Sequence, residues 1–364
     1  MKWVELGKFF PPDMGGIERV SEACARIVSA KGHDVRVIVF SETKASDDVV
    51  ADIGRVSRYA PWLTLASAPL SPGYVTNAVR AMRSADVVHV HMPNPLGALA
   101  VRLHPGKYQL IVHWHSDVIS QSRSTYLLYK RLETALLRRA DKIIVTTSAY
   151  ADASEALRRW IHKCVEVPLS TSDPQLPDAP TVPRTLLACG RLVPYKGFDV
   201  LIRAMALLPE TYRLRICGTG PLMQSLQQQI AAAGLQHRVE MLGFVSDARL
   251  AELMAEADVF CMPSITKAEA FGVSAIEAFA AGLPLVSSTL LGSGLTAINR
   301  HGITGLQFPV GDAAALAAAI TRICEDRPFR ASLAHGAREE FLARYTTAAY
   351  EKRFADACFG PQPT

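Results

Sequence analysis

The chain has 364 residues, which favours two domains, and 49% of its residues are apolar, enough for a sizeable core in each. Its net charge of +5 suits an anionic ligand or membrane surface and is too small to indicate nucleic acid as a partner. The seven cysteines include no Cys-x-x-Cys pair, which is typical of reduced packing residues in a cytosolic protein. The start of the chain lacks the apolar core of a signal peptide, and no apolar run reaches the length of a membrane span, so we expect a cytoplasmic protein.

Short apolar runs alternate with helical patterns along the chain. Strands are expected at 3–6, 35–40, 87–91, 109–114, 142–146, 184–189, 213–217, 238–242, 259–262 and 285–287. Helices are expected at 17–30, 125–140, 200–207, 221–233, 247–255, 273–281 and 313–325, and the stretch 332–359 is helical again. Apolar strands that alternate with helices predict parallel sheets covered on both faces.

One segment, 168–183, is rich in proline and serine and shows no periodicity, so we interpret it as a linker. A second alternation of strands and helices starts directly after it. The predicted fold class is therefore α/β, with two Rossmann-like doubly wound domains, 1–167 and 184–339, that face a central cleft.

Two carboxylates lie eight positions apart in the run 269–281. Glu277 belongs to an alanine-rich helix, and Glu269 lies at or just before its N-terminus, where unpaired amides and the helix dipole attract anions. Eight helical steps span roughly 12 Å, so the pair could bracket the diphosphate of a nucleotide-sugar. Glu277 could instead be a surface charge, but its apolar neighbours favour a buried or ligand-facing side chain.

Three glycine-containing loops follow expected strands. Arg191 and Lys196, between Gly190 and Gly197, could converge on a diphosphate, or they could be ordinary cations of a solvated loop. Gly218-Thr219-Gly220 could expose backbone groups to a base or phosphate, and a simple turn explains it equally well. Gly15-Gly16 precedes a helix, so it is either a phosphate cradle or a tight turn.

Two histidine pairs lie on neighbouring expected strands. Strand alternation places His113 and His115 on one face, and His89 and His91 form a similar pair. We interpret both pairs as mainly structural, with His91 and His115 nearer to a cleft. A metal site lacks further ligands at suitable spacing, and the chain contains no Asp-x-Asp, so we expect no metal.

The stretch 122–139 predicts a basic amphipathic helix. Its cations are Arg123, Lys130, Arg131, Arg138 and Arg139. It could dock on an anionic inner membrane leaflet, where lipid-linked acceptors lie, or it could be a helix of the fold with an ordinary solvated face.

Taken together, these motifs resemble the retaining glycosyltransferases of the GT-B fold, family 4. The motifs are Pro11-Pro12-x-x-Gly15-Gly16-x-Glu18, Gly190-Arg191-Leu192-x-x-x-Lys196-Gly197, Gly218-x-Gly220-Pro221, Gly243-Phe244-Val245, Glu269-x7-Glu277 and Gly302-Ile303-Thr304-Gly305-Leu306. The resemblance covers nearly the whole chain, and the order of the motifs is specific. Val310 departs from the family pattern, which has proline at that position.

The resemblance implies a role for each matched position. It places the donor-binding groups at Gly15, Gly16, Arg191, Lys196, Gly218, Val245, Glu269, Phe271, Gly272, Val273 and Glu277. Among these, Arg191 and Lys196 would bind the diphosphate, Glu269 the donor sugar and Glu277 the ribose. His115 would lie near the anomeric centre and the acceptor, so the catalytic group would comprise His115, Glu269, Arg191 and Lys196.

The resemblance also implies a reaction. It is a metal-independent transfer of a hexose with retention of configuration, by front-face substitution, although Asp117 could supply a carboxylate for a covalent intermediate. Similarity of 266–272 and 291–302 to bacterial polysaccharide mannosyltransferases makes GDP-mannose the first donor and a UDP-hexose the second. The acceptor would be a cell-surface polysaccharide, a lipid-linked saccharide or a glycolipid, reached in the cytoplasm or at the inner face of the membrane. The C-terminal helix, 340–359, would pack back on the first domain.

Two other classes of function remain open. A non-catalytic subunit that binds nucleotide-sugar would be favoured by loss of Glu269, Lys196 or Arg191, and all three are present. An epimerase or hydrolase of the same shape should show a different pattern of carboxylates and histidines.

Overall fold

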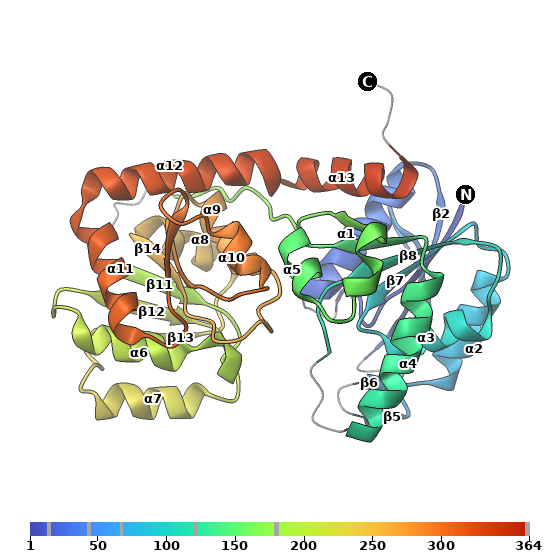
Figure 1. Ribbon diagram of the computed structural model, residues 1–364, viewed down its shortest axis with the longest axis horizontal. Helices are drawn as coiled ribbons and strands as arrows, with labels where there is room; N and C mark the ends of the chain where they lie inside the picture. Colours follow the sequence, from blue (N-terminus) through green and yellow to red (C-terminus); the bar gives the residue numbers. More distant parts are fainter. Residues whose placement is uncertain (13–15, 42–44, 66–67, 119–122, 178–181, 361–364) are drawn as a thin grey trace. The chain divides into compact units, whose positions relative to one another are not determined.

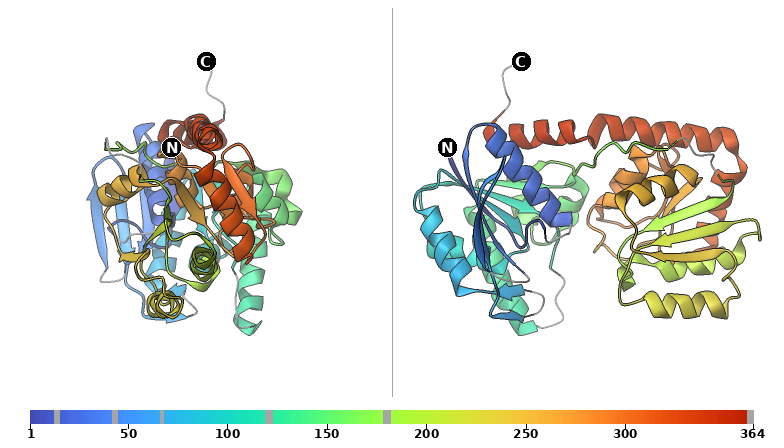
Figure 2. Two further views of the ribbon diagram at one scale, coloured as in Figure 1. Left: turned by 90° about the vertical axis from the view of Figure 1, so that its left-hand side faces the viewer. Right: turned by 180° about the vertical axis from the view of Figure 1, so that it is seen from behind.

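The computed structural model describes residues 1–12, 16–41, 45–65, 68–118, 123–177 and 182–360. The chain divides into two compact units. Unit 1 comprises Met1–Val167 together with Glu351–Thr364, and unit 2 comprises Pro168–Tyr350. Each unit contains a largely parallel sheet with helices on both faces (Figures 1 and 2).

The main sheet of unit 1 has the order β10-β9-β8-β7-β1-β2-β4-β3 among the described residues, and only β3 runs antiparallel to its neighbour. Its strands are β1 (Lys2–Leu6), β2 (Asp34–Phe40), β3 (Ser46–Val50), β4 (Gly54–Tyr59), β7 (Val87–Met92), β8 (Gln109–Trp114), β9 (Lys142–Val145) and β10 (Cys164–Glu166). The short strands β5 (Leu63–Leu65) and β6 (Ala68–Leu70) pair with each other. The central strands β1, β7 and β8 are almost wholly buried, as expected for a sheet covered on both faces.

The helices of unit 1 cover both faces of this sheet. They are α1 (Gly16–Ala30), α2 (Pro72–Met82), α3 (Pro95–Leu103), α4 (Arg123–Arg139), α5 (Ser148–Ala153) and the 3₁₀ turn Arg158–Lys163. Local side chains fix several starts: Asn94 accepts a hydrogen bond from the Gly97 amide at α3, and Thr147 accepts one from the Tyr150 amide at α5.

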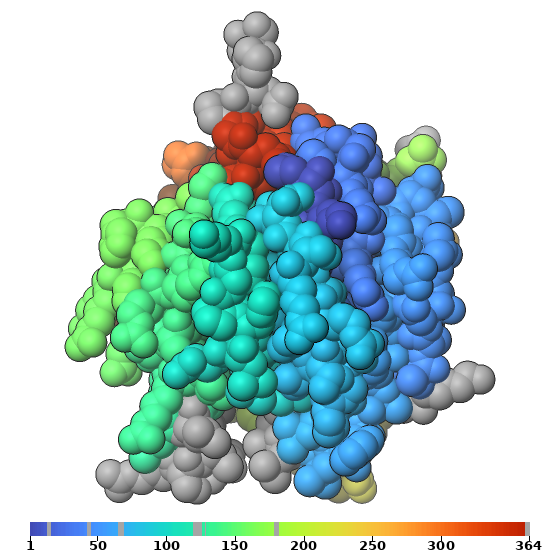
Figure 3. Space-filling model, turned by 90° about the vertical axis from the view of Figure 1, so that its right-hand side faces the viewer, coloured from blue at the N-terminus to red at the C-terminus, as the bar shows by residue number. Residues whose placement is uncertain are grey.

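The end of the chain returns to unit 1. In place of one helix over 340–359, the structure has the end of α12 (Arg327–Arg344) and all of α13 (Thr347–Phe359), separated by Tyr345 and Thr346. Phe354 of α13 packs edge-on against Trp3 of β1, and Lys142 Nζ donates to the Ala357 carbonyl at 2.5 Å. The space-filling view shows α13, in red, directly against the blue N-terminal segment (Figure 3). Unit 1 is therefore completed by residues from both ends of the chain.

The sheet of unit 2 is parallel throughout, with the order β13-β12-β11-β14-β15-β16 in the described chain. Its strands are β11 (Thr185–Cys189), β12 (Arg213–Cys217), β13 (Val239–Gly243), β14 (Val259–Met262), β15 (Leu285–Ser288) and β16 (Gly305–Phe308). The chain runs outward from β11 to β13 and then returns to β14 on the other side of β11. The strand order thus reverses between β11 and β14, the place where open α/β sheets bind ligands.

Helices cover the sheet of unit 2 and bury its core. They are the 3₁₀ turn Pro194–Lys196, α6 (Phe198–Leu207), α7 (Met223–Ala232), α8 (Asp247–Glu256), α9 (Val273–Ala280), α10 (Gly294–Ile298), α11 (Ala313–Glu325) and α12. The core combines inward residues of the strands with apolar residues of α6, α7, α11 and α12. None of the helices in the described ranges is long and apolar enough to cross a membrane.

The strands and helices expected from periodicity are all present, with ends within two residues of those expected, apart from the divided C-terminal helix. Periodicity missed β3, β4, β5, β6, β10, β16, α2, α3, α5 and α10. Part of the expected linker is also tied down within unit 2, because both carboxylate oxygens of Asp173 accept from Arg338 at 2.6 Å.

Candidate functional site

Two charged side chains meet at the carboxyl edge of the sheet in unit 2. Lys196 ends the 3₁₀ turn after β11, and Glu269 lies in the loop between β14 and α9. Lys196 Nζ lies 2.6 Å from Glu269 Oε2, and their side chains are only 13% and 8% exposed. Because β11 and β14 are neighbours at the reversal of strand order, this ion pair occupies the position where a ligand is expected.

Gly197 allows the two loops to come this close. Its φ of +67° lies in the left-handed region, and a Cβ added there would be 2.1 Å from the Pro263 carbonyl oxygen. The Ile265 amide also donates to the Tyr195 carbonyl at 2.8 Å. A side chain at residue 197 would therefore separate the Lys196 loop from the loop that leads to Glu269.

Two serines hold Glu269 in place. Ser264 Oγ donates to Glu269 Oε2 at 3.0 Å, and the Ser293 hydroxyl donates to the Glu269 carbonyl. The Gly294 amide then donates to the Ala270 carbonyl at 2.8 Å. Sequence reasoning did not identify Ser264 as a supporting residue, and the available signal was a hydroxyl side chain two residues after the end of β14, five positions before Glu269.

The loops after β11, β12 and β13 form a single backbone layer at the same edge. The Gly190 amide donates to the Cys217 carbonyl at 3.0 Å, and the Gly218 amide donates to the Gly243 carbonyl at 2.6 Å. A Cβ at Gly218 would lie 1.9 Å from the Gly190 carbonyl oxygen. The layer brings Gly218 and the loop of Val245, which is half-buried, to the same edge as Lys196.

The helix α9 starts at this edge. Gly272 is its N-cap with a φ of +96°, Val273 is its first residue, and Phe271 is buried. Glu277 is half-buried one turn further along. Glu269 lies three residues before the N-cap, so the helical spacing of roughly 12 Å expected from the sequence does not describe this pair.

The electrostatics of Cys189 place Glu277 and Lys196 near the end of β11. Burial raises the pKa of the Cys189 thiol to about 12, repulsion from Cys217 and Glu277 adds to this shift, and Lys196 opposes it. The side chain of Arg191 is exposed on the same loop as Lys196. No ion pair or hydrogen bond engages that guanidinium within the described ranges, so Arg191 is available to an anion.

The predicted residues of unit 1 that the structure describes lie just after β8 and at the start of α1. His115 follows β8, and Gly16 is the first residue of α1, whereas Gly15 lies outside the described residues. His115 is buried, and its Nε2 lies 2.9 Å from His91 Nδ1. The shared face predicted for the histidine pairs is confirmed, since the rings of His113 and His115 stack with centroids 4.5 Å apart.

Asp117 supports the loop after β8. Its Oδ1 accepts from Trp114 Nε1 at 3.2 Å and from Ser154 Oγ at 2.6 Å, and its amide donates to the Tyr150 hydroxyl. These contacts tie Asp117 to the end of β8 and to α5 with its C-cap.

Two basic side chains of the helix α4 form contacts inside unit 1. Arg139 donates to the carbonyls of Gly106 and Tyr108, and Lys130 pairs with the buried Glu133 at 2.8 Å. Arg131 and Arg138 are exposed. The contacts of Arg139 and Lys130 favour the interpretation of α4 as a helix of the fold, and the exposed pair is compatible with an anionic surface.

Comparison with known proteins agrees with this architecture. Residues 14–168 match the model of the family described as Glycosyltransferase Family 4, and residues 172–340 match that of Glycosyl transferases group 1. The D-rhamnosyltransferase WbpZ of Pseudomonas aeruginosa is 30% identical over 94% of this chain and 88% of its own. A phosphatidyl-myo-inositol mannosyltransferase of Mycobacterium leprae is 31% identical over 87% of this chain and 85% of its own.

Among solved structures, HepE of Anabaena in complex with UDP has a TM-score of 0.77 at 21% identity, covering 98% of this chain and 99% of that one. The two Rossmann-like units therefore define a glycosyltransferase of the GT-B fold. The chain belongs to glycosyltransferase family 4.

Proposed function

We propose that this protein transfers a hexose of manno configuration, with GDP-mannose as the first donor, to a cell-surface polysaccharide, a lipid-linked saccharide or a glycolipid. Two relatives that align along most of the chain are named for the transfer of mannose and of D-rhamnose. D-rhamnose is mannose without its 6-hydroxyl, so both sugars present the same configuration at C2, C3 and C4. A UDP-hexose is the second donor candidate.

The observation that carries this proposal is the ion pair of Lys196 and Glu269 at the switch point of unit 2. A bound diphosphate would take up positive charge from Lys196, and Arg191 would add a two-pronged contact. The carboxylate of Glu269, held by Ser264, would accept hydrogen bonds from sugar hydroxyls. The pair thus offers a cation to the phosphates and an acceptor to the sugar at adjacent positions.

The other donor contacts are assigned to the same edge of unit 2 and to the first loop of unit 1. Glu277 would bind the ribose, the Val245 backbone the base, and the amides of Phe271, Gly272 and Val273 the sugar or phosphate. Gly218, Gly15 and Gly16 would allow close backbone approach.

We propose a front-face substitution with retention of configuration and without a metal. The leaving phosphate would accept the proton of the acceptor hydroxyl, and Lys196 and Arg191 would stabilise the negative charge that develops on the diphosphate. His115 would contact the sugar or acceptor hydroxyls. The Asp117 carboxylate is a poor candidate nucleophile because Trp114 and Ser154 already hold it.

We place the reaction in the cytoplasm, with contact at the inner face of the membrane where the acceptor is lipid-linked. Arg131 and Arg138 of α4 would face the anionic headgroups.

Donor binding tests the proposal directly. Thermal stability and nucleotide release are measured with GDP-mannose, UDP-glucose, UDP-galactose, UDP-N-acetylglucosamine and the free nucleotides. The same panel is repeated with Lys196→Ala, Glu269→Gln and the control Lys267→Ala, which removes an equal charge from an exposed lysine on the Glu269 loop.

Stabilisation by GDP-mannose that is lost in Lys196→Ala and Glu269→Gln, and kept in Lys267→Ala, is the expected result. Stabilisation by a UDP-sugar alone would identify that UDP-sugar as the donor in place of GDP-mannose. Binding without nucleotide release in the presence of any acceptor fraction would favour the non-catalytic subunit, and no stabilisation at all would reject the site.

A further inference from the structure

A buried chain of hydrogen bonds leads from α1 to His115. The Ser21 hydroxyl of α1 donates to Glu5 Oε1 of β1, and the same oxygen lies 3.1 Å from His91 Nε2 of β7. His91 Nδ1 then lies 2.9 Å from His115 Nε2, just past β8. The strands β1, β7 and β8 are adjacent in the sheet, so the chain crosses three neighbouring strands on one face.

The order of donors and acceptors in this chain of hydrogen bonds is set by Glu5, which is ionised. Burial alone would raise the pKa of Glu5, but its hydrogen bond with His91 and the nearby ring of His89 outweigh burial and lower the pKa to about 2. An ionised carboxylate only accepts hydrogen bonds. His91 Nε2 must therefore carry the proton that it donates to Glu5.

The tautomer of His115 follows from the same logic. If the proton given to Glu5 is the only one on His91, the Nδ1 atom of that ring has a lone pair and accepts, so His115 Nε2 is the donor and His115 Nδ1 is left unprotonated. The pKa of His115 is held well below its usual value, first by burial and then by repulsion from His91 and His89, so this ring is neutral. His115 is 8% exposed, whereas His89, His91 and His113 are 0%, 1% and 0% exposed.

We propose that Ser21, Glu5 and His91 are positioning residues that hold His115 in its Nε2–H tautomer, so that its Nδ1 accepts a hydrogen bond from a hydroxyl of the donor sugar or the acceptor saccharide. This inference rests on the proposed function, which assigns that contact to His115. Along the polypeptide, Glu5 and His91 are 86 residues apart, and His91 and His115 are 24 residues apart.

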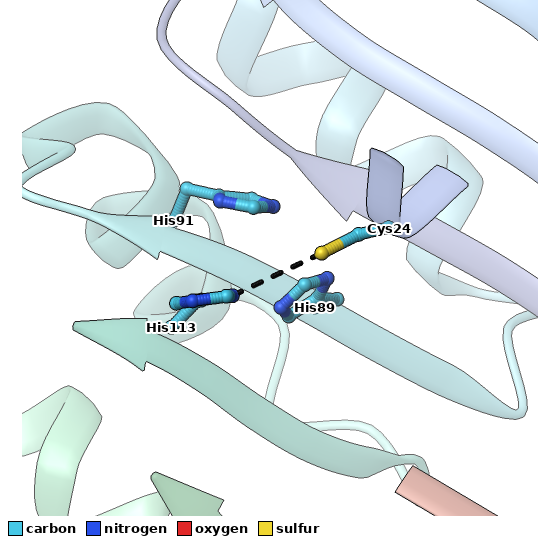
Figure 4. A group of neighbouring side chains, drawn as sticks. All are labelled: Cys24, His89, His91 and His113. Carbon is cyan, nitrogen blue, oxygen red and sulfur yellow. Dashed lines mark hydrogen bonds between the residues drawn. The ribbon is translucent and has the colours of Figure 1, made fainter. Parts of the chain in front are cut away.

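A metal ion is the competing explanation for this cluster. The donor atoms of Cys24, His89, His91 and His113 lie within 4.8 Å of one another, and Figure 4 shows the four side chains converging from α1, β7 and β8. A metal lies in the ring plane of an imidazole ligand. The rings of His91 and His113 are stacked at 19° with centroids 5.2 Å apart, an arrangement that does not direct two nitrogens at one point. Both nitrogens of His91 also already have partners, Glu5 and His115.

The test observes the proton on His115 directly. The full chain is labelled with ¹⁵N-histidine, and long-range ¹⁵N–¹H spectra report the tautomer of each ring, with His115 assigned by its loss in His115→Asn. We expect the Nε2–H tautomer in the natural protein and a mixture of tautomers in His91→Phe. The matched control is His89→Phe, on the same strand and equally buried. His89 is not a link between Glu5 and His115, so this variant should keep the Nε2–H tautomer of His115.

Glu5→Gln provides a second variant if His91→Phe does not fold. Glutamine keeps the volume of Glu5 but can also donate, so the direction of the chain is lost and a second tautomer of His115 should appear. An Nδ1–H tautomer in the natural protein, or an unchanged tautomer in both variants, would overturn the inference. One equivalent of zinc in the purified protein, lost in His91→Phe, would overturn it as well.

Turnover separates this inference from the proposed function. His91→Phe should lower kcat by roughly 10²-fold, the scale of a mispositioned proton-transfer or hydrogen-bonding group. The Kd of the free nucleotide should stay unchanged, because Val245 and Glu277, which are proposed to bind the base and the ribose, lie in unit 2. If His115→Asn leaves kcat intact, the role of His115 is wrong even where the tautomer behaves as expected. If His115→Asn abolishes turnover but His91→Phe changes neither tautomer nor kcat, the positioning role is wrong and the function stands.

Discussion

At the scale of single residues, the contact between Lys196 and Glu269 concentrates opposite charges where little water reaches them. Truncating one partner of such a pair leaves the other charge buried and unpaired, which costs more than replacing both. The same two charges stabilise unit 2 and would meet a bound anion, so the pair links the free energy of unfolding of unit 2 to the binding of an anionic ligand.

This coupling is measurable. We expect Lys196→Met to destabilise unit 2 by about 3 kcal/mol and the double variant with Glu269→Gln to be clearly more stable than that single variant. Urea unfolding of the two variants, the natural protein and Lys267→Met gives the comparison. Additive losses in the double variant would show that the two charges do not interact.

The buried histidines make unit 1 sensitive to acid. Burial, followed by repulsion from His91, lowers the pKa of His89 from 6.5 to about 4, and the pKa values of His113 and His115 are also lowered by burial. Between these values the unfolded chain binds more protons than the folded one, so stability is lost as the pH falls from 6.5 towards 4. Glu5 acts in the same direction at lower pH, between its ordinary value of 4.5 and about 2.

Moving from pH 7.5 to pH 5 should therefore cost about 2 kcal/mol through His89 alone, at about 1.4 kcal/mol per pKa unit. Urea unfolding at the two pH values measures the loss. His89→Phe should reduce this pH dependence, and substitution of the exposed His335 by glutamine should not. A pH dependence that His89→Phe leaves intact would contradict the assignment.

The sequence predicted some of these residues better than others. The approach of Lys196 to Glu269 could be predicted, because both residues follow strands that the periodicity identifies and a parallel sheet brings such loops to one edge. The hydrogen bonds that connect Glu5 to His115 were not predicted. Alternation tells which face of the sheet a side chain occupies, but not which strands are neighbours in the sheet. Spacing along the sequence likewise could not show that Cys24 approaches His113 from a helix 89 residues away.

At the scale of elements, close approach of loops is what builds the candidate site. Gly197 and Gly282 have nearly the same φ, +67° and +70°, but a Cβ at Gly282 would meet nothing within 4 Å. Substitution of Gly282 thus measures the free-energy cost of a left-handed backbone alone, whereas substitution of Gly197 adds the cost of pushing two loops apart.

Gly282→Ala should destabilise unit 2 by about 1 kcal/mol, the cost of a left-handed conformation for an L-residue. Gly197→Ala should cost more and also weaken nucleotide-sugar binding at least tenfold, because it displaces Lys196 from Glu269. Urea unfolding of both variants measures their loss of stability, and titration with the donor measures their loss of affinity. Equal effects in the two variants would mean that the contact with Pro263 is unimportant.

The elements that periodicity missed share identifiable causes. The edge strand β3 is largely exposed and carries Asp47 and Asp48, so it lacks an apolar alternation. The helices α2 and α3 begin with Pro72 and Pro95, and proline at a first turn is easily taken for a loop. These elements are specified by their neighbours in the fold more than by their own pattern.

At the scale of the whole molecule, unit 1 depends on a segment that follows unit 2 in the chain. Phe354 of α13 is fully buried against Trp3 and His89. The expectation that the C-terminal stretch belongs with the first domain came from resemblance to a family, because nothing in its helical periodicity says which unit it covers.

Phe354→Ala should therefore destabilise unit 1 by about 3–5 kcal/mol, as expected for the loss of a buried aromatic ring. Leu342→Ala on α12, where the side chain is 53% exposed, is the control. Thermal unfolding with and without nucleotide-sugar distinguishes the units, since the donor should still stabilise unit 2. Loss of donor binding in Phe354→Ala would show that the units do not unfold independently.

The division of unit 1 between Met1–Val167 and Glu351–Thr364 also sets an order of events during synthesis. Unit 2 is one continuous stretch, so it can fold as soon as it leaves the ribosome, whereas the first 167 residues wait for the last fourteen. At about 5–20 residues per second, roughly ten to forty seconds separate the emergence of these two parts. During that interval the surface that α13 will cover, including Trp3, is exposed to the cell, and a nascent chain at this stage is a natural client for chaperones.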